Sequence, residues 1–530
     1  MSPATIVFAI AAIAGAQAPG GAQTPAAARA ASASLAPAAV LTDIASRLDR
    51  QDLAGARTAV DSALRTYPND AALHNFAGVI DAESHAAASA EAHFQTSIRL
   101  APREPSAYEN LGRLYQERAA ADPAAREEAI DVYRRLLEVD PANVEGLYQS
   151  AFLLALGGRF GDSRAHLDRL PADVRQQSHS LALAALDLAA TGDSGASAVF
   201  AALAAHPGFA AEDVIALVPA MDHLKDDEAA RGLFEALDTR GLATAGTLQR
   251  LGRIHLGHQR YAEARAVLER AAAAAPSDVS ILVDLARSAD KAKDHEGALG
   301  YLAHARALAP DDANIHFLFG IVCIEMDLVG EAYDSLKKAV TLAPDNPQVN
   351  YVMGSVAMHR HEPAESLPYF EKYIALMPND PRGRFALGVA RFTSGMLAEA
   401  KGDLAASVAR PETAAGSHYF LGRIARQEND LETAQREVSA ALKLAPDLAD
   451  GWSELGLIQT RLGNVAEAER SLNKALAIDP NHYQANVNLG TLYARTKDPR
   501  RDAQAARIAT LQEQRNTRAQ DFLRVIEVVP

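Results

Sequence analysis

An apolar residue followed by a small residue returns every 34 residues through the second half of the chain: Leu251-Gly252, Leu285-Ala286, Phe319-Gly320, Met353-Gly354, Leu387-Gly388, Leu421-Gly422, Leu455-Gly456 and Leu489-Gly490. Prolines keep nearly the same period and are expected to close each interval: Pro276, Pro310, Pro344, Pro378, Pro411, Pro446 and Pro480. A fixed period of this length indicates a repeat architecture. We therefore predict one continuous array in place of several globular domains.

The interval 449–480 shows the internal pattern of one repeat most clearly. Its first half places four residues on one helical face at spacings of three and four: Trp452, Leu455, Gly456 and Gln459. Its second half continues with Ala468, Leu472 and Ala475. Gly463 and Pro480 stand where helices are expected to end. We predict two antiparallel helices that approach closely because Gly456 leaves space for a neighbour.

This pattern resembles the tetratricopeptide repeat, whose motif residues are matched by Trp452, Leu455-Gly456, Ala468, Leu472, Ala475 and Pro480. Gln459 departs from the aromatic of the family, which Tyr493 restores in the next interval. An earlier stretch matches through Tyr108, Leu111-Gly112, Tyr115, Ala129 and Pro141. The chain is identified as a bacterial, repeat-only member of this family. The resemblance implies an all-α, right-handed superhelical solenoid of antiparallel helix pairs, about 14 units long, with the first helices lining a concave groove.

The strength of the repeat signal divides the chain into six segments: a signal peptide (1–18), a linker rich in Ala, Gly and Pro that is expected to be disordered (19–39), N-terminal repeats (40–159), divergent helical repeats (160–246), regular repeats (247–497), and a C-terminal capping helix with a tail (498–530). Extra residues at 119–125 are expected in the turn between two paired helices. Within 160–246 four stretches still predict helices: 181–188, 199–205, 214–218 and 229–237.

The N-terminal apolar run, residues 4–16, is too short to span a bilayer but fits the hydrophobic region of a secretion signal. Ala14-Gly15-Ala16 supplies the small residues that a signal peptidase needs. We therefore expect a periplasmic or secreted protein. A cytoplasmic location stays open, because no Lys or Arg precedes the run. No other stretch is long and apolar enough to span a membrane, so we expect no integral membrane segment after signal removal.

Composition limits the classes of partner and the kinds of cysteine chemistry expected of the chain. The 52 Lys and Arg face 67 Asp and Glu, a formal net charge of -15, which argues against nucleic acid because phosphate binding needs clustered cations. Cys323 is the single cysteine and excludes an intramolecular disulfide. Its place beside the small-residue position predicts a buried packing role.

No motif for enzymatic or metal chemistry is present: the sequence has no Gly-rich phosphate loop, nucleophile elbow, His-Glu-x-x-His pattern or EF-hand loop. His359 with His361 and His255 with His258 form two close pairs. Neither has a third ligand at a suitable spacing. We predict no catalytic residue, no cofactor and no metal, with 160–246 as the only stretch that leaves room for a hidden activity.

Repeat symmetry singles out eight candidate binding residues. Three positions before the small residue stand Phe317, Tyr351, Phe385 and Tyr419, and four positions after it stand Ile324, Met358, Phe392 and Arg426. The resemblance would place both sets toward the groove, where they would form an apolar strip that receives a peptide through side-chain anchors. Packing within the array is the alternative role.

The combined prediction is a non-catalytic, monomeric scaffold that binds a protein or peptide partner in the groove. The alternative is a subunit that handles an exported polysaccharide or another cell-envelope polymer with the same groove. A carboxylate clamp for acidic C-terminal tails is disfavoured, because the corresponding positions offer Asn75, Asn110 and Arg113 but not the full set.

Overall fold

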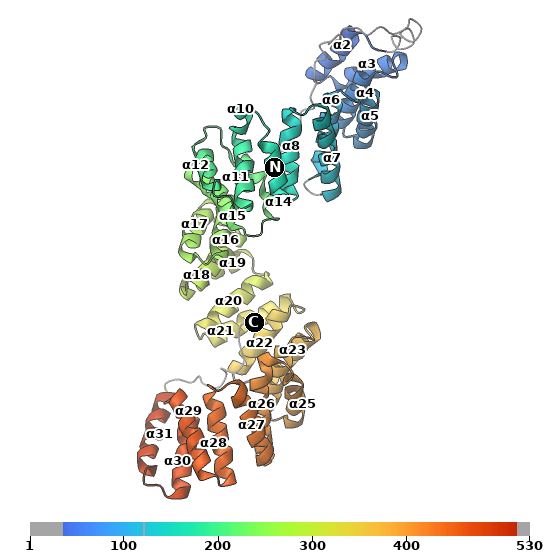
Figure 1. Cartoon of the computed structure of the whole chain (residues 1–530). Coiled ribbons are helices and arrows are strands. Elements are labelled where there is room, and N and C mark those ends of the chain that lie inside the picture. The colour runs from blue at the N-terminus through green and yellow to red at the C-terminus, as the bar shows by residue number, and fades with distance from the viewer. Residues whose placement is uncertain (1–34, 120–121, 517–530) are drawn as a thin grey trace. The chain divides into compact units, whose positions relative to one another are not determined.

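The computed structural model describes residues 35–119 and 122–516, and every regular element in that part is a helix. The chain divides into two compact units, Met1–Ala274 and Ala275–Pro530. Within each unit most helices form pairs joined by short turns (Figure 1). This confirms the predicted all-α array of helix pairs. The predicted signal peptide and residues 19–34 of the predicted linker lie outside the described residues.

Unit 1 opens with regular helix pairs: α2 (Ala38–Asp49) with α3 (Leu53–Thr66), α4 (Ala71–Glu83) with α5 (Ala87–Leu100), α6 (Pro105–Ala119) with α7 (Pro123–Val139), and α8 (Val144–Leu156) with α9 (Phe160–Leu167). It continues through α10 (Ala172–Arg175), α11 (Ser178–Ala190), α12 (Ala196–Ala205), α13 (Ala211–Ile215), α14 (Val218–Met221) and α15 (Glu228–Thr239). It closes with α16 (Ala245–Gly257) and α17 (Tyr261–Ala274).

Two local predictions in unit 1 need correction. The extra residues at 119–125 mostly lengthen the helices around the turn, since α6 has 15 residues and α7 has 17. Asp122 caps α7 and Pro123 occupies its first position, where the missing N–H costs nothing. The predicted helix at 214–218 is interrupted, because α13 ends at Ile215 and α14 begins at Val218. Pro219 has no N–H to bond the carbonyl of Ile215, so the first helix cannot continue.

Unit 2 is a regular run of pairs: α18 (Val279–Lys291) with α19 (His295–Leu308), α20 (Ala313–Glu325) with α21 (Val329–Leu342), α22 (Pro347–His359) with α23 (Pro363–Leu376), α24 (Pro381–Thr393) with α25 (Leu397–Ser407), α26 (Pro411–Gln427) with α27 (Leu431–Leu444), α28 (Ala449–Leu462) with α29 (Val465–Ile478), and α30 (Tyr483–Thr496) with α31 (Arg501–Asn516). The prolines follow the second helices as predicted, except that Pro411 opens α26.

Local chemistry explains where the first helices begin. An Asp or Asn precedes many of them and accepts a hydrogen bond from a backbone N–H of the first turn: Asp70, Asn143, Asp278, Asp312, Asn346 and Asp380. Such caps satisfy N–H groups that have no partner inside the helix. Together with the prolines behind the second helices, they fix the length of each repeat.

The small residue of the repeat sits where the paired helices meet. A β-carbon added at Gly456 on α28 would lie 2.5 Å from Cγ of Leu472 on α29. Ala468, Leu472 and Ala475 are all fully buried. The close packing predicted from the sequence is confirmed.

In unit 2 and the last pair of unit 1, the turn within each pair contains one residue in the left-handed region, and these residues recur every 34 positions: Gln259, Lys293, Asp327, His361, Gly395, Asn429, Gly463 and Lys497. Gly and Asn tolerate this conformation. For the other side chains it costs about 1–2 kcal/mol. The strain follows from the turn geometry that brings each second helix back along the first.

Cys323 on α20 is fully buried, as predicted, and burial raises the pKa of its thiol to about 11. It is therefore a packing residue at neutral pH. Among the helices that the structure describes, none combines the length and the apolar character needed to cross a bilayer.

A C-terminal helix is present as α31 (Arg501–Asn516), and its capping role stays a prediction. Its Ile508 fills the space beside Gly490 on α30, and Leu511 is buried. Gln504 Nε2 donates hydrogen bonds to the backbone oxygen of Asn486 at 3.1 Å and to its Oδ1 at 2.9 Å. The part of the prediction that continues this helix to residue 523 lies outside the described residues beyond Asn516.

Deleting everything after Thr496 should expose the apolar side of α30, including Leu489, because terminal repeats need a polar outer layer. We expect the truncated protein to aggregate and to unfold at a lower temperature than the full chain. Light scattering and thermal melts followed by circular dichroism would measure both. A soluble truncation with an unchanged melting temperature would contradict the capping role of α31.

Candidate functional site

Five of the eight predicted binding residues lie inside the array: Tyr351, Met358, Phe385, Phe392 and Tyr419 are buried. The cause is that the first helix of one repeat packs against the first helix of the next, as α24 does against α26. Phe317, Ile324 and Arg426 are only partly buried. A binding role for the strip stays a prediction, and these three residues are the ones that keep exposed surface for it.

The buried aromatics form packing contacts within a helix pair and between neighbouring repeats. Tyr351 meets Tyr373 with ring centroids 5.0 Å apart. Phe420, which the sequence pattern did not single out, lies 5.4 Å from Phe392 and 5.1 Å from Tyr419, centroid to centroid. We call Phe385, Phe392, Tyr419 and Phe420 the ring cluster. The ring cluster holds α26 against α24 and supports the side chains that pack on it.

Phe317 faces a cavity at the N-terminal ends of α20 and α22. The cavity measures about 450 Å³ and is lined by Asp311, Asp312, Ala313, Asn314, Phe317, Asn346 and Val349. Its acidic rim is already engaged, since Lys338 Nζ lies 3.0 Å from Oδ1 of Asp311 and Asp312 caps α20. The groups of the cavity wall that a ligand can contact are therefore the ring of Phe317 and the exposed side chain of Asn314.

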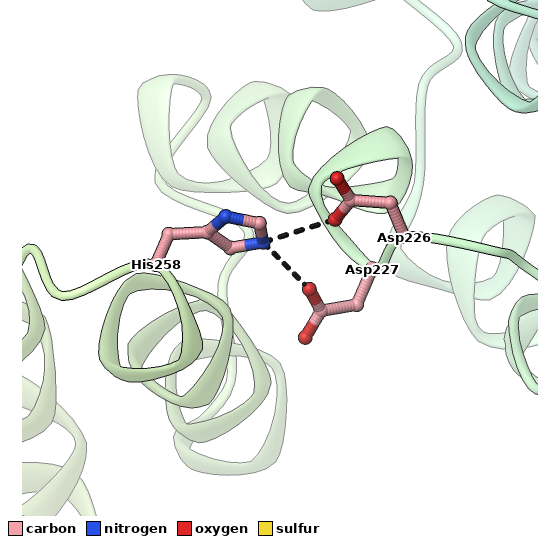
Figure 2. A group of neighbouring side chains, drawn as sticks. All are labelled: Asp226, Asp227 and His258. Carbon is pink, nitrogen blue, oxygen red and sulfur yellow. Dashed lines mark hydrogen bonds and ion pairs between the residues drawn. The ribbon is translucent and has the colours of Figure 1, made fainter.

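His258 meets two aspartates that sequence spacing did not connect with it. Figure 2 shows His258, the residue that ends α16, pointing between Asp226 and Asp227 just before α15. Its Nε2 lies 3.0 Å from Oδ1 of Asp226 and 2.9 Å from Oδ1 of Asp227. The sequence paired His258 with His255, whereas the structure places Asp226 and Asp227 beside His258. His255 points elsewhere and accepts a hydrogen bond from Nε of Arg260.

Among the residues that the structure describes, Asp226, Asp227 and His258 are the one group whose ligand atoms could reach a common metal ion. These three side chains also form an ion-pair network among themselves. The hydrogen bond to Asp227 raises the pKa of His258, which favours the imidazolium between the carboxylates. Next to them Arg260 and Arg231 hold the pKa of Glu228 at about 2. The network joins the start of α15 to the end of α16.

Asp187 is a buried carboxyl group that the sequence pattern did not single out. It lies on α11 with no exposed surface, and Ser163 Oγ on α9 donates to its Oδ2 at 2.7 Å. Its Oδ1 has no hydrogen-bond partner in the described part of the chain. Burial raises the pKa of Asp187 to about 8, and the Ser163 hydrogen bond offsets only part of that rise. The group is therefore mostly neutral at pH 7.

The residues considered for a carboxylate clamp are engaged with other side chains. Asn110 Nδ2 donates to Oδ1 of Asn75 at 3.0 Å, and Arg113 pairs with Glu145 at 3.1 Å. These contacts link successive first helices of unit 1. They are what a packing role predicts for such polar positions.

The chain is similar in structure to several solved proteins. Yeast Tom70 is 15% identical over 86% of this chain and 98% of its own, with a TM-score of 0.35. The Cut9 and Hcn1 hetero-tetramer of APC/C gives 12% identity, 86% and 96% coverage and a TM-score of 0.37. PilW, a widely conserved type IV pilus biogenesis factor, gives 21% identity, 40% and 98% coverage and a TM-score of 0.36.

Comparison of the sequence with curated proteins gives no match. Family models for the tetratricopeptide repeat match residues 45–105, 255–318, 419–483 and 454–517. These matches fall in both units, on helix pairs that share the period and the packing described above. The chain contains tetratricopeptide repeats in both of its units.

Proposed function

We propose that the chain is a non-catalytic scaffold that binds a peptide or protein segment along the first-helix face of unit 2, meaning the exposed surface of α20, α22, α24, α26, α28 and α30. Tetratricopeptide arrays act in general as protein-protein interaction scaffolds. Stacked repeats present extended surfaces that suit this task.

The observation that carries the proposal is the cavity beside Phe317. Phe317 keeps exposed surface and lines a cavity of about 450 Å³. That volume is enough for a large apolar side chain of a partner. Aromatic walls with a few polar groups around them are typical of anchor pockets in peptide recognition.

The expected occupant is an apolar anchor within an otherwise polar segment. Of the two aspartates at the rim, Asp311 pairs with Lys338 and Asp312 caps α20. Exposed Asn314 and the carbonyl groups of the helix-connecting loop can hydrogen-bond a peptide backbone. Binding would therefore combine burial of one side chain with backbone contacts.

Replacing Asn314 by Trp should fill the cavity and weaken peptide binding at least tenfold. The probe is a peptide enriched on the full-length protein from a random dodecapeptide phage library, synthesised with a fluorescent label. Fluorescence anisotropy measures its Kd. Asn314 is exposed, so we expect the melting temperature to stay within about 2 °C of the wild type.

Lys443→Trp on α27 is the matched control, because it adds the same bulk at an exposed position of a second helix. It should leave the Kd unchanged. Equal binding by Asn314→Trp and the wild type would remove the Phe317 cavity from the proposed site. A selection that enriches no peptide would contradict peptide binding itself.

A further inference from the structure

Arg423 on α26 occupies a repeat position that is uncharged in the neighbouring repeats and is arginine again in Arg287 and Arg253. The residues one, two and three periods before it and one period after it are Val389, Ser355, Ile321 and Leu457, none of which is charged. The guanidinium lies over the ring cluster, 4.9 Å from the ring centroid of Phe392 and 5.5 Å from those of Tyr419 and Phe420. Three aromatic rings thus hold one cation in place.

No carboxylate of the described chain pairs with Arg423. Two acidic residues of α28 have partners of their own: Glu454 pairs with Arg426, and Oδ1 of Asp450 lies 3.0 Å from Nε2 of His482. The buried Nε of Arg423 has no hydrogen-bond acceptor. Leaving such a donor unsatisfied costs about 1–3 kcal/mol.

The restricted orientation of the Arg423 guanidinium also favours binding of an anion. Stacking on the ring cluster restricts its orientation, so less side-chain entropy is lost when a ligand binds. A carboxylate matches the paired N–H groups of arginine in shape and charge. Arg423 is only partly buried, so it can be reached from the solvent.

We propose that Arg423 binds the side-chain carboxylate of an aspartate or glutamate in the bound peptide. The proposal rests on the function proposed above and adds a second contact, three repeats along the same face from Phe317. An internal side chain is the expected source, because α28 and α30 continue the first-helix face beyond α26. A scaffold of this kind would select partners that carry an apolar anchor and an acidic residue.

The test begins with the same phage selection on the full chain. In this format the carboxyl end of each peptide is fused to the coat protein, so any selected carboxylate is a side chain. We expect enriched peptides to share an Asp or Glu. With a formal net charge of -15 the protein as a whole repels acidic peptides. Such an enrichment would therefore report a local cationic site.

A double-mutant cycle then locates the contact. One enriched peptide, made with an amidated C-terminus, is compared with its Asn or Gln counterpart on the wild type and on Arg423→Gln. We expect either change alone to weaken binding at least tenfold, and both together to weaken it little further. Arg436→Gln, on the exposed side of α27, is the control and should bind both peptides as the wild type does.

Arg423→Lys keeps the charge but loses the paired N–H geometry, and we expect it to recover only part of the affinity. It also keeps the test valid if Arg423→Gln proves unstable in circular dichroism. Enriched peptides without an acidic residue would overturn the assignment of Arg423 while leaving peptide binding intact. The same holds if Arg423→Gln discriminates the two peptides as strongly as the wild type. A selection that enriches nothing overturns the proposed function and this assignment with it.

Discussion

Replacing Asp187 by Asn should remove a large pH dependence from the stability of the protein. In the folded state the pKa of this carboxyl is about 8, against an ordinary value of 3.8. Between these values the folded state holds a proton that the unfolded chain has released, so the free energy of unfolding falls as the pH rises. From pH 5 to pH 8 the loss should be about 3–4 kcal/mol.

Urea denaturation followed by circular dichroism at pH 5, 6.5 and 8 measures this effect. The variant should lose about 3–4 kcal/mol less than the wild type over that range, because an amide stays uncharged. Asp131→Asn on α7 serves as the control, since the Asp131 side chain is 55% exposed and its removal should leave the profile unchanged. Parallel profiles of Asp187→Asn and the wild type would show that Asp187 is ionised in the folded protein.

Replacing Gly456 by Leu should destabilise the protein by about 1–3 kcal/mol, the usual effect of adding bulk to a close-packed interior. The added β-carbon alone would meet Leu472 at 2.5 Å. Both helices would have to move apart, and each also packs against its neighbours in the array. Urea denaturation at a fixed pH gives the change in the free energy of unfolding.

Gly402→Leu is the matched control for this substitution. Gly402 lies in the interior of α25, and beyond the local backbone no atom lies within 4 Å of an added β-carbon. Leu is the better helix former by about 0.5–1 kcal/mol, so this variant should be neutral or slightly more stable. If the two glycine variants unfolded alike, the close approach of α28 and α29 would be refuted.

The fold of the regular repeats could be predicted because all the intervals share one residue pattern. Gly456 and Leu472 recur in type at each period, and a periodic signal is read many times along the chain. The break between α13 and α14 was missed because it rests on one residue, Pro219, outside the periodic stretches. The division at Ala274 and Ala275 could not be seen, since it falls within an unbroken periodic run.

The binding strip was harder to predict, because periodicity identifies equivalent positions but not their exposure. Phe317 and Tyr351 occupy the same position in successive repeats, yet Phe317 keeps exposed surface while Tyr351 is buried against Tyr373. Contacts between residues far apart in sequence were equally hidden. His258 and Asp227 are 31 positions apart, and only the packing of α15 beside α16 brings them together.

The left-handed turn residues that are neither Gly nor Asn place conformational strain in separate repeats of the array. Gln259, Lys293, Asp327 and His361 are sequence-equivalent and lie in separate turns. Because distant sites act nearly independently, exchanging them for glycine would change stability in separate, additive steps. The chain thus contains several turn positions, outside its first-helix face, at which a substitution changes stability stepwise. Natural variation at these turns could tune the rigidity of individual repeats without altering which partner the array selects.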